Sequence, residues 1–256
     1  MNIYYVEKSI KTIKNKKLKS YFFIPASKLD KTNNIIKLGV NEVIIDFEDS
    51  ILSFNKSIYL EQLNANENKN NFWLRIPLRD DYDNDMDLTF LDETNKLGFR
   101  KIVLPKITSL KELQLILHRF KNNKFIVLVE HPKLLHEINN LGVKDEKLLN
   151  QIVGIGLGSH DLTTYINAAH SFDVINYPRL KLLYLCKAFS ISAIDIASMN
   201  IKNDIDFKKD LTYTFDHGFD GKFLIHPNQL KWVNEFQNSY IEKITWAQKI
   251  VKHLPK

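Results

Sequence analysis

Short runs of consecutive apolar residues alternate along the chain with longer segments in which apolar residues recur every three or four positions. A short, continuously apolar run rich in β-branched and aromatic residues is typical of a strand that is buried on both faces. The three-to-four-residue period is typical of a helix that packs on a core through one side. This pattern predicts eight strands, at residues 20–26, 42–48, 72–77, 101–106, 124–130, 152–158, 192–198 and 222–226.

The segments between these strands predict helices, at residues 28–38, 57–63, 87–97, 110–120, 133–141, 179–189 and 207–217. Gly39, Gly98, Gly142 and Gly218 each follow such a segment, at the position where a left-handed residue commonly ends a helix. Buried strands in strict alternation with helices predict an α/β fold, a closed parallel (β/α)8 TIM barrel. An open doubly wound sheet is the alternative.

No stretch of the sequence has the length and composition of a linker between domains. The longest polar stretches, NANENKNN and RDDYDNDMD, are short enough to connect a strand with a helix. The segment at about 229–254 has the apolar periodicity of an amphipathic helix that closes the barrel. We therefore expect a single domain over residues 1–256, with the barrel strands at about 20–226.

Composition narrows the classes of function. The net charge of +6 comes with only five arginines, and the lysines are scattered among many asparagines and isoleucines, so no basic stripe predicts nucleic-acid binding. No apolar run approaches the roughly 18 residues of a membrane span, and the N-terminus lacks the pattern of a signal peptide. The single cysteine, Cys186, excludes an intramolecular disulfide and is interpreted as a core thiol in a cytoplasmic protein.

Polar residues follow the predicted strands at the ends where a barrel of this kind carries its chemistry. Because the carboxyl ends of all eight strands meet at one face, we expect these side chains to gather there. They are Asp46, Glu48, Asp49, Arg75, Lys106, Glu130, His160 and Asp161.

Glu130 is the most informative of these residues, because five apolar residues run directly into it. A carboxylate at the end of a buried strand has lost much of its water and must be protonated, hydrogen-bonded or bound to a cation. His131 and Pro132 supply the N-cap and first residue of the next helix, so Glu130 is not needed as a cap. Asp161 is either the N-cap of a helix or a site residue. Glu48 and Asp49 likewise either cap, pair with a lysine, or belong to the site.

Glu130 and Asp161 end consecutive strands, so the barrel would make them neighbours. Two carboxylates with room for water suit Mg2+. Zinc is a poor fit, because the sequence has no HExxH motif and only one cysteine. The acidic stretch with Asp81, Asp83 and Asp85 is similar to the start of a calcium loop, but Met86 stands where a glycine is needed, which predicts a solvated loop.

Several segments, in order, resemble motifs of the HpcH/HpaI aldolase/citrate lyase family, which includes the citrate lyase beta-subunit. The segment YFFIPASKLDKTNNIIKLGVNEVIIDFEDSI resembles the opening strand, the first helix and the family's "LDLEDAV" strand. FWLRIP resembles "RVN", KIVLPK resembles "LPK", and FIVLVE resembles "IET". GIGLGSHDL resembles "GxxDL", and DHGFDGKFLIHPNQL resembles "GFDGK..IHP". Each motif is weak alone, but their order over nearly the whole chain identifies it as a member of this family.

The resemblance implies a (β/α)8 barrel in which Glu130 and Asp161 hold Mg2+. It implies that Arg75 binds a substrate carboxylate and that Glu48 and Asp49 organise the rim. Family members cleave or form a carbon–carbon bond next to a 2-oxo or 3-hydroxy acid, often as a CoA thioester, and are often trimers or hexamers. We therefore expect a homo-oligomer that acts on a small oxo or hydroxy acid by enolate chemistry.

Further residues are expected at the same site. We expect Lys106 and His160 to take part in catalysis, and Pro77, Gly158 and Ser159 to contact the substrate. His160 and His226 are the candidates for proton transfer, because histidine titrates near neutral pH.

The sequence also departs from the family pattern. His-Pro-Lys follows Glu130 where the family has small residues and a glycine, and Pro77 replaces a polar residue. The chain stops at KHLPK, before the C-terminal lid of CoA-using relatives, so we expect a substrate that is not a CoA thioester. Two alternatives stay open: an aldolase that forms a Schiff base on Lys106, and a barrel that binds a ligand or partner without turnover.

Overall fold

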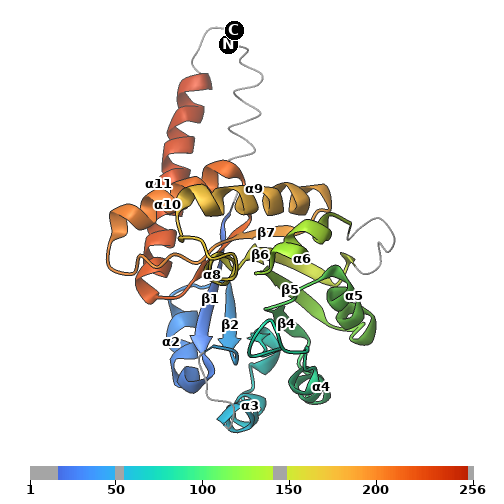
Figure 1. Cartoon of the computed structure of the whole chain (residues 1–256). Helices are drawn as coiled ribbons and strands as arrows, with labels where there is room; N and C mark the ends of the chain where they lie inside the picture. Colours follow the sequence, from blue (N-terminus) through green and yellow to red (C-terminus); the bar gives the residue numbers. More distant parts are fainter. Residues whose placement is uncertain (1–16, 50–54, 141–148, 253–256) are drawn as a thin grey trace.

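The computed structural model describes residues 17–49, 55–140 and 149–252. Its centre is a closed barrel of parallel strands in sequence order, closed by the pairing of the first strand with the last (Figure 1). The predicted (β/α)8 TIM barrel is therefore confirmed, and the open-sheet alternative is wrong. The strands are β1 (Lys19–Pro25), β2 (Glu42–Asp46), β3 (Trp73–Arg75), β4 (Lys101–Leu104), β5 (Lys124–Val129), β6 (Ile152–Leu157), β7 (Ser192–Asp195) and β8 (Gly221–Leu224).

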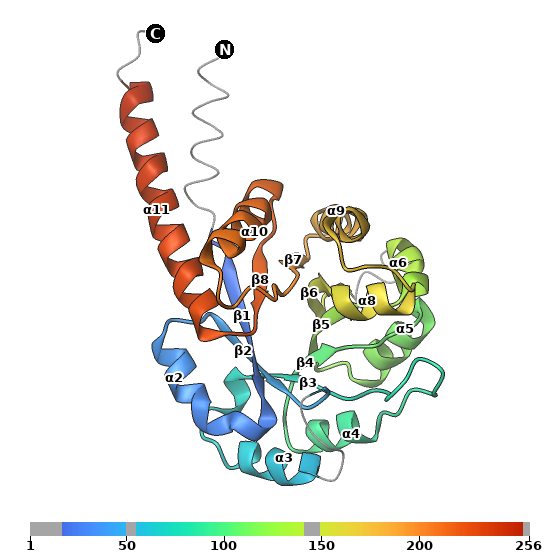
Figure 2. The same ribbon diagram turned by 60° about the vertical axis from the view of Figure 1, so that its left-hand side comes forward.

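Helices surround the barrel, and the last of them extends well beyond it (Figure 2). None of the helices in the described part of the chain combines the length and the apolar content that a membrane span requires. The helices are η1 (Ala26–Lys31), α2 (Thr32–Lys37), α3 (Lys56–Asn64), η3 (Lys69–Asn71), α4 (Thr89–Lys96), α5 (Leu110–Arg119), α6 (Pro132–Glu137), η4 (Ile138–Asn140), α8 (Ser159–Tyr165), α9 (Phe172–Ala188), α10 (Asp204–His217) and α11 (Pro227–Lys252).

Two apolar cores explain why the strands are apolar without alternation. Side chains such as Ile44, Ile126 and Phe223 fill the inside of the barrel, while their neighbours along each strand pack outward against the helices. Cys186 belongs to the outer core and is fully buried, which raises the pKa of its thiol to about 12. This confirms its interpretation as a core thiol.

The main differences from prediction lie at the ends of elements. β2 ends at Asp46 rather than residue 48, and β7 ends at Asp195 rather than residue 198, although the apolar residues Phe47 and Ile196 directly follow these ends. The helix predicted from residue 179 starts at Phe172 and contains Pro178 in its interior. α8 begins at Ser159, whereas the sequence suggested a helix there only as an alternative, with Asp161 as its N-cap.

The glycine predictions hold where the structure describes the residue. Gly39, Gly98 and Gly218 have φ values of 82°, 90° and 98°, in the region that favours glycine. Gly142 lies outside the described residues. Asp81, Asp83 and Asp85 are exposed, as expected for a solvated loop.

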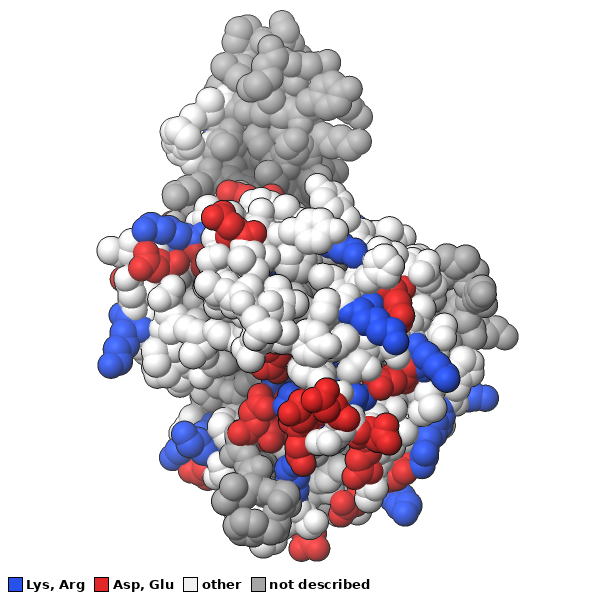
Figure 3. Space-filling model, viewed as in Figure 1, with Lys and Arg blue, Asp and Glu red and all other residues white. Residues whose placement is uncertain are grey.

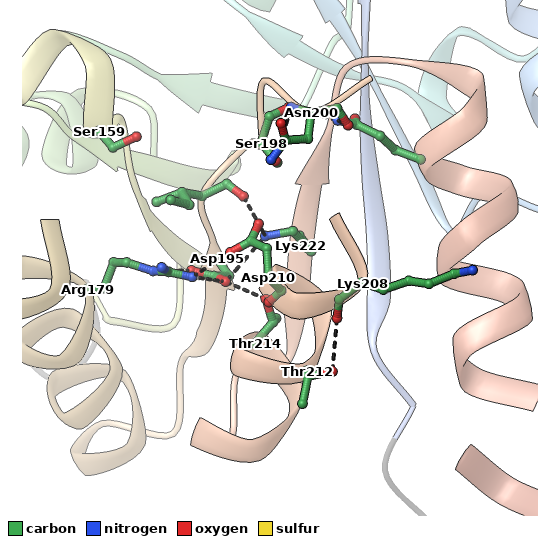
Figure 4. A network of polar contacts seen from close by, with 12 residues as sticks. Ser159, Arg179, Asp195, Ser198, Asn200, Lys208, Asp210, Thr212, Thr214 and Lys222 are labelled. Carbon is green, nitrogen blue, oxygen red and sulfur yellow. Dashed lines mark hydrogen bonds and ion pairs between the residues drawn. The ribbon is translucent and has the colours of Figure 1, made fainter. Parts of the chain in front are cut away.

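A buried ion network joins the last two strands of the barrel to the helices that cover them (Figure 4). Arg179 of α9 donates to both carboxylate oxygens of Asp195 at 2.9 and 2.6 Å. Lys222 of β8 lies 2.7 Å from Asp210 of α10 and 3.4 Å from Asp195. Thr214 donates to Asp195 at 2.5 Å. Two positive and two negative side chains thus balance in an interface where Arg179, Asp195 and Lys222 are almost fully buried, as a buried ion network requires.

We predict that Lys222→Met destabilises the protein by about 3 kcal/mol, because it leaves the carboxylates of Asp195 and Asp210 short of a buried partner. Lys208→Met is the matched control, since Lys208 pairs with Asp204 on an exposed helix face. We expect a change of less than about 0.5 kcal/mol for this control. Urea unfolding of both variants measures the difference, and equal losses would contradict a structural role of the network.

Candidate active site

A cavity of about 300 Å³ opens at the carboxyl ends of the strands. Its polar lining residues are Asp46, Asp49, Arg75, Glu130, Ser159, His160 and Asp161. Apolar side chains, called here the apolar wall, also line it: Phe23, Leu128, Leu157, Ala197, Phe223 and Ile225. In Figure 3 acidic side chains gather over the lower part of the barrel, near β2 and β4 of Figure 1, with basic atoms between them. A larger groove of about 770 Å³ runs along the outer face of α9, but the charged residues of the barrel mouth do not line it.

Arg75 is the centre of an ion cluster at the end of β3. Its Nε and Nη2 atoms donate to Asp46 at 2.8 and 2.7 Å, since the two residues are paired across β2 and β3. Its Nη1 atom lies 2.7 Å from Glu48 and 3.1 Å from Asp49. Burial lowers the pKa of Arg75, but the bonds with Asp46 and the other carboxylates outweigh it and raise that pKa overall. The guanidinium is therefore held charged and in a fixed orientation.

Lys106 connects this cluster to Glu130. Its Nζ lies 2.9 Å from Glu48 and 3.6 Å from Asp49. Its backbone N–H donates to Oε2 of Glu130 at 2.6 Å, and its φ of 50° directs that group toward the carboxylate. A left-handed conformation at a residue other than glycine costs about 1 kcal/mol, so the surrounding contacts must hold this turn in place.

Glu130 is only 2% exposed, at the end of the apolar strand β5. Burial, followed by the charges of Glu48 and Asp161, raises its pKa well above the ordinary value. Gly158 makes room for it, because a Cβ at that position would lie 2.3 Å from Oε1 of Glu130. The pKa of Asp161 is also raised, by burial and then by Asp49. Acidic side chains are therefore crowded into a site that has little water, which favours their protonated forms when no cation is bound.

The donor set fits a hard divalent cation. Five carboxylates (Asp46, Glu48, Asp49, Glu130 and Asp161) face two cationic side chains, Arg75 and Lys106, which leaves an excess of negative charge when all are ionised. Over the described ranges, no three His, Cys, Asp or Glu side chains are arranged to enclose a metal. A cation held at Glu130 and Asp161 would therefore complete its shell with water or substrate oxygens, as Mg2+ does.

The loop after β7 forms part of the apolar wall and is held by hydrogen bonds from two buried side chains. Lys222 donates to the carbonyl of Ile196 at 3.0 Å, and Gln229 donates to the carbonyl of Ser198 at 2.7 Å. Both donors are fully buried. Because Ala197 lies between these two carbonyls, the wall that it forms beside the cavity is held in one position.

Most of the residues predicted for the site come together, but two do not. Gly158, Ser159 and His160 line the cavity with the carboxylates. Pro77 lines a separate surface depression, because the chain turns away from the barrel axis after β3. His226 does not line the cavity among the described residues; its Nδ1 accepts from the N–H of Asn228 at 3.2 Å, as a helix cap does.

The structure tests two predicted capping roles, one after β5 and one after β6. His131 caps α6 by accepting from Lys133 N–H, with Pro132 at the first helical turn, as predicted. Asp161 is not an N-cap, because α8 begins at Ser159 and Asp161 lies in its first turn.

Sequence reasoning missed several residues of the site. Asp46 was placed at the rim from the sequence but given no role there, and the structure shows it as the bidentate partner of Arg75. The apolar wall carries no signal, because its residues read as core. His170 stacks on His160 with ring centroids 3.9 Å apart, from a loop that has no motif.

Comparisons with known proteins agree with this architecture. The model of the HpcH/HpaI aldolase/citrate lyase family matches residues 19–227. Mitochondrial citramalyl-CoA lyase of Homo sapiens is 25% identical, over 91% of this chain and 74% of its own length. Citrate lyase subunit beta of Haemophilus influenzae is 22% identical, over 91% and 84%. The fold is similar to that of protein CitE of Mycobacterium tuberculosis in complex with magnesium, acetoacetate and coenzyme A, with a TM-score of 0.76 and 19% identity over 93% of this chain and 87% of that one.

The crowding of carboxylates predicts a dependence of stability on pH. Burial raises the pKa of Glu48 to about 7, against the opposing charges of Arg75 and Lys106. A raised carboxyl pKa means that the folded state binds the proton more tightly than the unfolded state. Stability is therefore lost as pH rises from the unfolded pKa, near 4.5, to the folded pKa.

We expect Glu48→Gln to remove this loss. Without divalent cations, the free energy of unfolding of Glu48→Gln, relative to that of wild type, should rise by about 2 to 3 kcal/mol between about pH 5 and pH 8. Urea unfolding at the two pH values measures this, with Glu67→Gln on an exposed loop as the control. A difference between Glu48→Gln and wild type that does not change with pH would show that Glu48 is charged throughout.

Proposed function

Because the chain belongs to the HpcH/HpaI aldolase/citrate lyase family, we propose that it is a Mg2+-dependent carbon–carbon lyase that acts on a small 2-oxo or hydroxy acid. The observation that carries this proposal is the cavity itself. It joins two carboxylates from neighbouring strands, Glu130 and Asp161, to a guanidinium at the same rim. Such a site offers a cation to a carbonyl oxygen and a positive group to a carboxylate.

The relatives support this class of substrate. By name, one acts on citramalyl-CoA and another is a subunit of citrate lyase. The related CitE structure holds magnesium together with acetoacetate. All of these compounds carry an acid group within two or three carbons of a carbonyl or hydroxyl group.

The residues of this chain divide the work as follows. Glu130 and Asp161 hold Mg2+, which when bound acts as a Lewis acid that stabilises negative charge on a substrate oxygen. Arg75 orients the substrate carboxylate. Its Nε edge is occupied by Asp46, so the substrate takes the place of Asp49, which is half exposed and is the longest of the Arg75 ion pairs at 3.1 Å.

The apolar wall limits the water in the site. Phe23, Leu128 and Phe223 line the same cavity as the carboxylates. With little water between them, the charges of the rim act on the substrate through a low dielectric and are stronger than in solution. His160 is the proton-transfer candidate that lines this cavity, whereas His226 is occupied as a helix cap.

A Schiff-base aldolase is disfavoured by the state of Lys106. Burial lowers the pKa of its ammonium, but the ion pair with Glu48 outweighs it and raises that pKa above the ordinary value. A nucleophilic lysine needs the opposite shift. Lys106 instead serves as a fixed positive charge whose backbone holds Glu130.

Four finer points stay predictions: that the substrate is a free acid rather than a CoA thioester, that the protein forms a homo-oligomer, that it is one domain, and that it is cytoplasmic. Parallel assays of free acids and their CoA thioesters test the first point. Light scattering in solution tests the second.

We predict that Glu130→Gln and Asp161→Asn each lower Mg2+-dependent turnover by at least about 100-fold while the protein remains folded. Exchange of the methyl protons of pyruvate for deuterium, followed by NMR with and without Mg2+, measures enolate formation without knowledge of the second substrate. Cleavage of a panel of oxo and hydroxy acids extends the test.

Asp173→Asn, on the exposed start of α9, is the matched control and should keep full activity. Retained activity in both site variants would refute the assignment. A protein that Mg2+ with pyruvate or oxaloacetate stabilises against heat, yet that exchanges and cleaves nothing, would be the non-catalytic barrel instead.

A further inference from the structure

The apolar wall of the cavity reaches as far as Arg75. The guanidinium of Arg75 lies 5.2 Å from the centre of the Phe23 ring, and the rings of Phe23 and Phe223 lie 5.3 Å apart. Ile225 follows Phe223 by two residues, lines the same cavity and is 36% exposed. The surface that adjoins the cation of the site is therefore apolar.

The ring of Phe223 has a fixed place in the barrel. A Cβ at Gly156 would lie 2.4 Å from Cε2 of Phe223, so the ring occupies the space that the glycine leaves. The ring also meets the edge of the Tyr21 ring, with the two centroids 6.1 Å apart. Only 2% of Phe223 is exposed. It lines the cavity with a rigid surface that lacks hydrogen-bonding groups.

The polar groups of the two loops that carry Ala197 and Ile225 are already paired. Gln229 of α11 is fully buried and accepts from the N–H groups of Ile225 at 2.9 Å and His226 at 3.3 Å. It donates to the carbonyls of Ser198 at 2.7 Å and Asn200 at 3.2 Å. One carboxamide thus joins the loop after β8 to the loop after β7. Its hydrogen-bonding capacity is used up, and the N–H of Ile225 is not free for a ligand.

Positive charge is available to a ligand at only one place along the cavity. Among the described residues that line it, Arg75 is the only lysine or arginine. Lys222 of β8 is fully buried in the ion network behind the wall, where two carboxylates hold it. His160 also lines the cavity, but it stacks on His170, and its positive form is balanced by the neighbouring Asp161. The cavity therefore provides one fixed cation for one carboxylate.

These features predict opposite effects for two kinds of substrate chain. A second carboxylate at the far end of the chain would lose water against the apolar wall and find no cation there, which is costly. An alkyl chain in the same place would bury apolar surface, which favours binding by about fourfold for each added carbon. The cavity volume of about 300 Å³ is at the lower end for ligand sites, so the chain must be short.

We propose that the site selects a 2-oxo acid with one carboxylate and a short alkyl chain, and that it rejects acids with a second carboxylate at the end of that chain. The carboxylate lies at Arg75, and the alkyl chain lies against Phe23, Phe223 and Ile225. This inference rests on the proposed lyase function, which supplies the metal and the oxo group that binds it.

A comparison of 2-oxovalerate with 2-oxoglutarate tests the proposal, because both have five carbons and differ only at the far end. Binding to the wild-type protein in the presence of Mg2+ is measured by calorimetry, and deuterium exchange at C3 is measured by NMR. We expect 2-oxovalerate to bind at least about 50-fold more tightly and to have the higher kcat/KM for exchange. Across pyruvate, 2-oxobutyrate and 2-oxovalerate, affinity should rise by about fourfold per carbon.

Ile225→Lys supplies the missing cation. We expect it to shift the ratio of the two affinities toward 2-oxoglutarate by at least about tenfold. The ratio is taken within one variant, so any weaker binding of Mg2+ beside the new charge affects both acids alike. Ile225→Met, of similar size and without charge, should keep the wild-type ratio within about twofold. Ile205→Lys, on an exposed position of α10, controls for added surface charge.

Several outcomes would overturn the proposal and leave the lyase function standing. Equal affinity of the wild-type protein for the two acids is one, and a preference for 2-oxoglutarate is another. An unchanged ratio in Ile225→Lys would also refute it. Ala197→Lys repeats this test from the loop after β7 if Ile225→Lys does not fold.

The wild-type protein separates the selectivity from the lyase function. If it binds 2-oxovalerate selectively with Mg2+ but neither exchanges nor cleaves any acid, the lyase function fails and the selectivity belongs to a binding barrel. If it binds neither acid with Mg2+, both proposals fail. Selective binding together with selective exchange supports both.

Discussion

The burial of one carboxylate, that of Glu130, constrains the rest of the rim. An apolar strand delivers it to a position where only 2% of the residue is exposed, so protein groups must replace the water that it has lost. Lys106 takes a left-handed conformation and supplies a backbone N–H. Gly158 supplies space that any side chain would fill. Neither feature stabilises the fold on its own, because the conformation of Lys106 is strained and Gly158 has no side chain to pack. Both are explained if they accommodate a carboxylate that binds a cation.

Two ion networks of this barrel show how charge balance separates a structural role from a functional one. Behind β7 and β8, Arg179 and Lys222 meet Asp195 and Asp210, and the charges cancel in a largely buried interface. At the mouth, carboxylates outnumber cations, and burial together with this surplus of negative charge raises the pKa values of Glu130 and Asp161. A balanced buried network needs no further partner. An unbalanced network lowers its free energy by binding a positive ion. The repulsion between its carboxylates is relieved when the metal binds, which increases the affinity for the metal.

The sequence predicted the barrel well, because continuous apolarity and helix-ending glycines depend on burial and backbone geometry, which are local properties. It also placed Glu130 and Asp161 at one rim, since strand order fixes which ends are neighbours. The prediction from sequence failed where the direction of a side chain, or the partner that it bonds, determines the role of the residue. Pro77 follows the correct strand but lines another depression, and Asp46 was placed at the rim without the role that it has in holding Arg75. Several strands were predicted to end later than they do, because the pattern of apolar and polar residues does not show where the hydrogen bonds of the sheet stop.

The departures of this chain from its family's motifs form one structural unit rather than separate changes. His131 stands where the family has a small residue, and its ring fills the space between Tyr82 and Tyr165. A small residue there would leave the loop after β3 without a surface to pack on. The His131 ring is therefore coupled by packing to the loop that carries Tyr82, although neither of these two residues lines the cavity. We expect the loops that follow the strands, rather than the strands themselves, to decide which acid the site accepts.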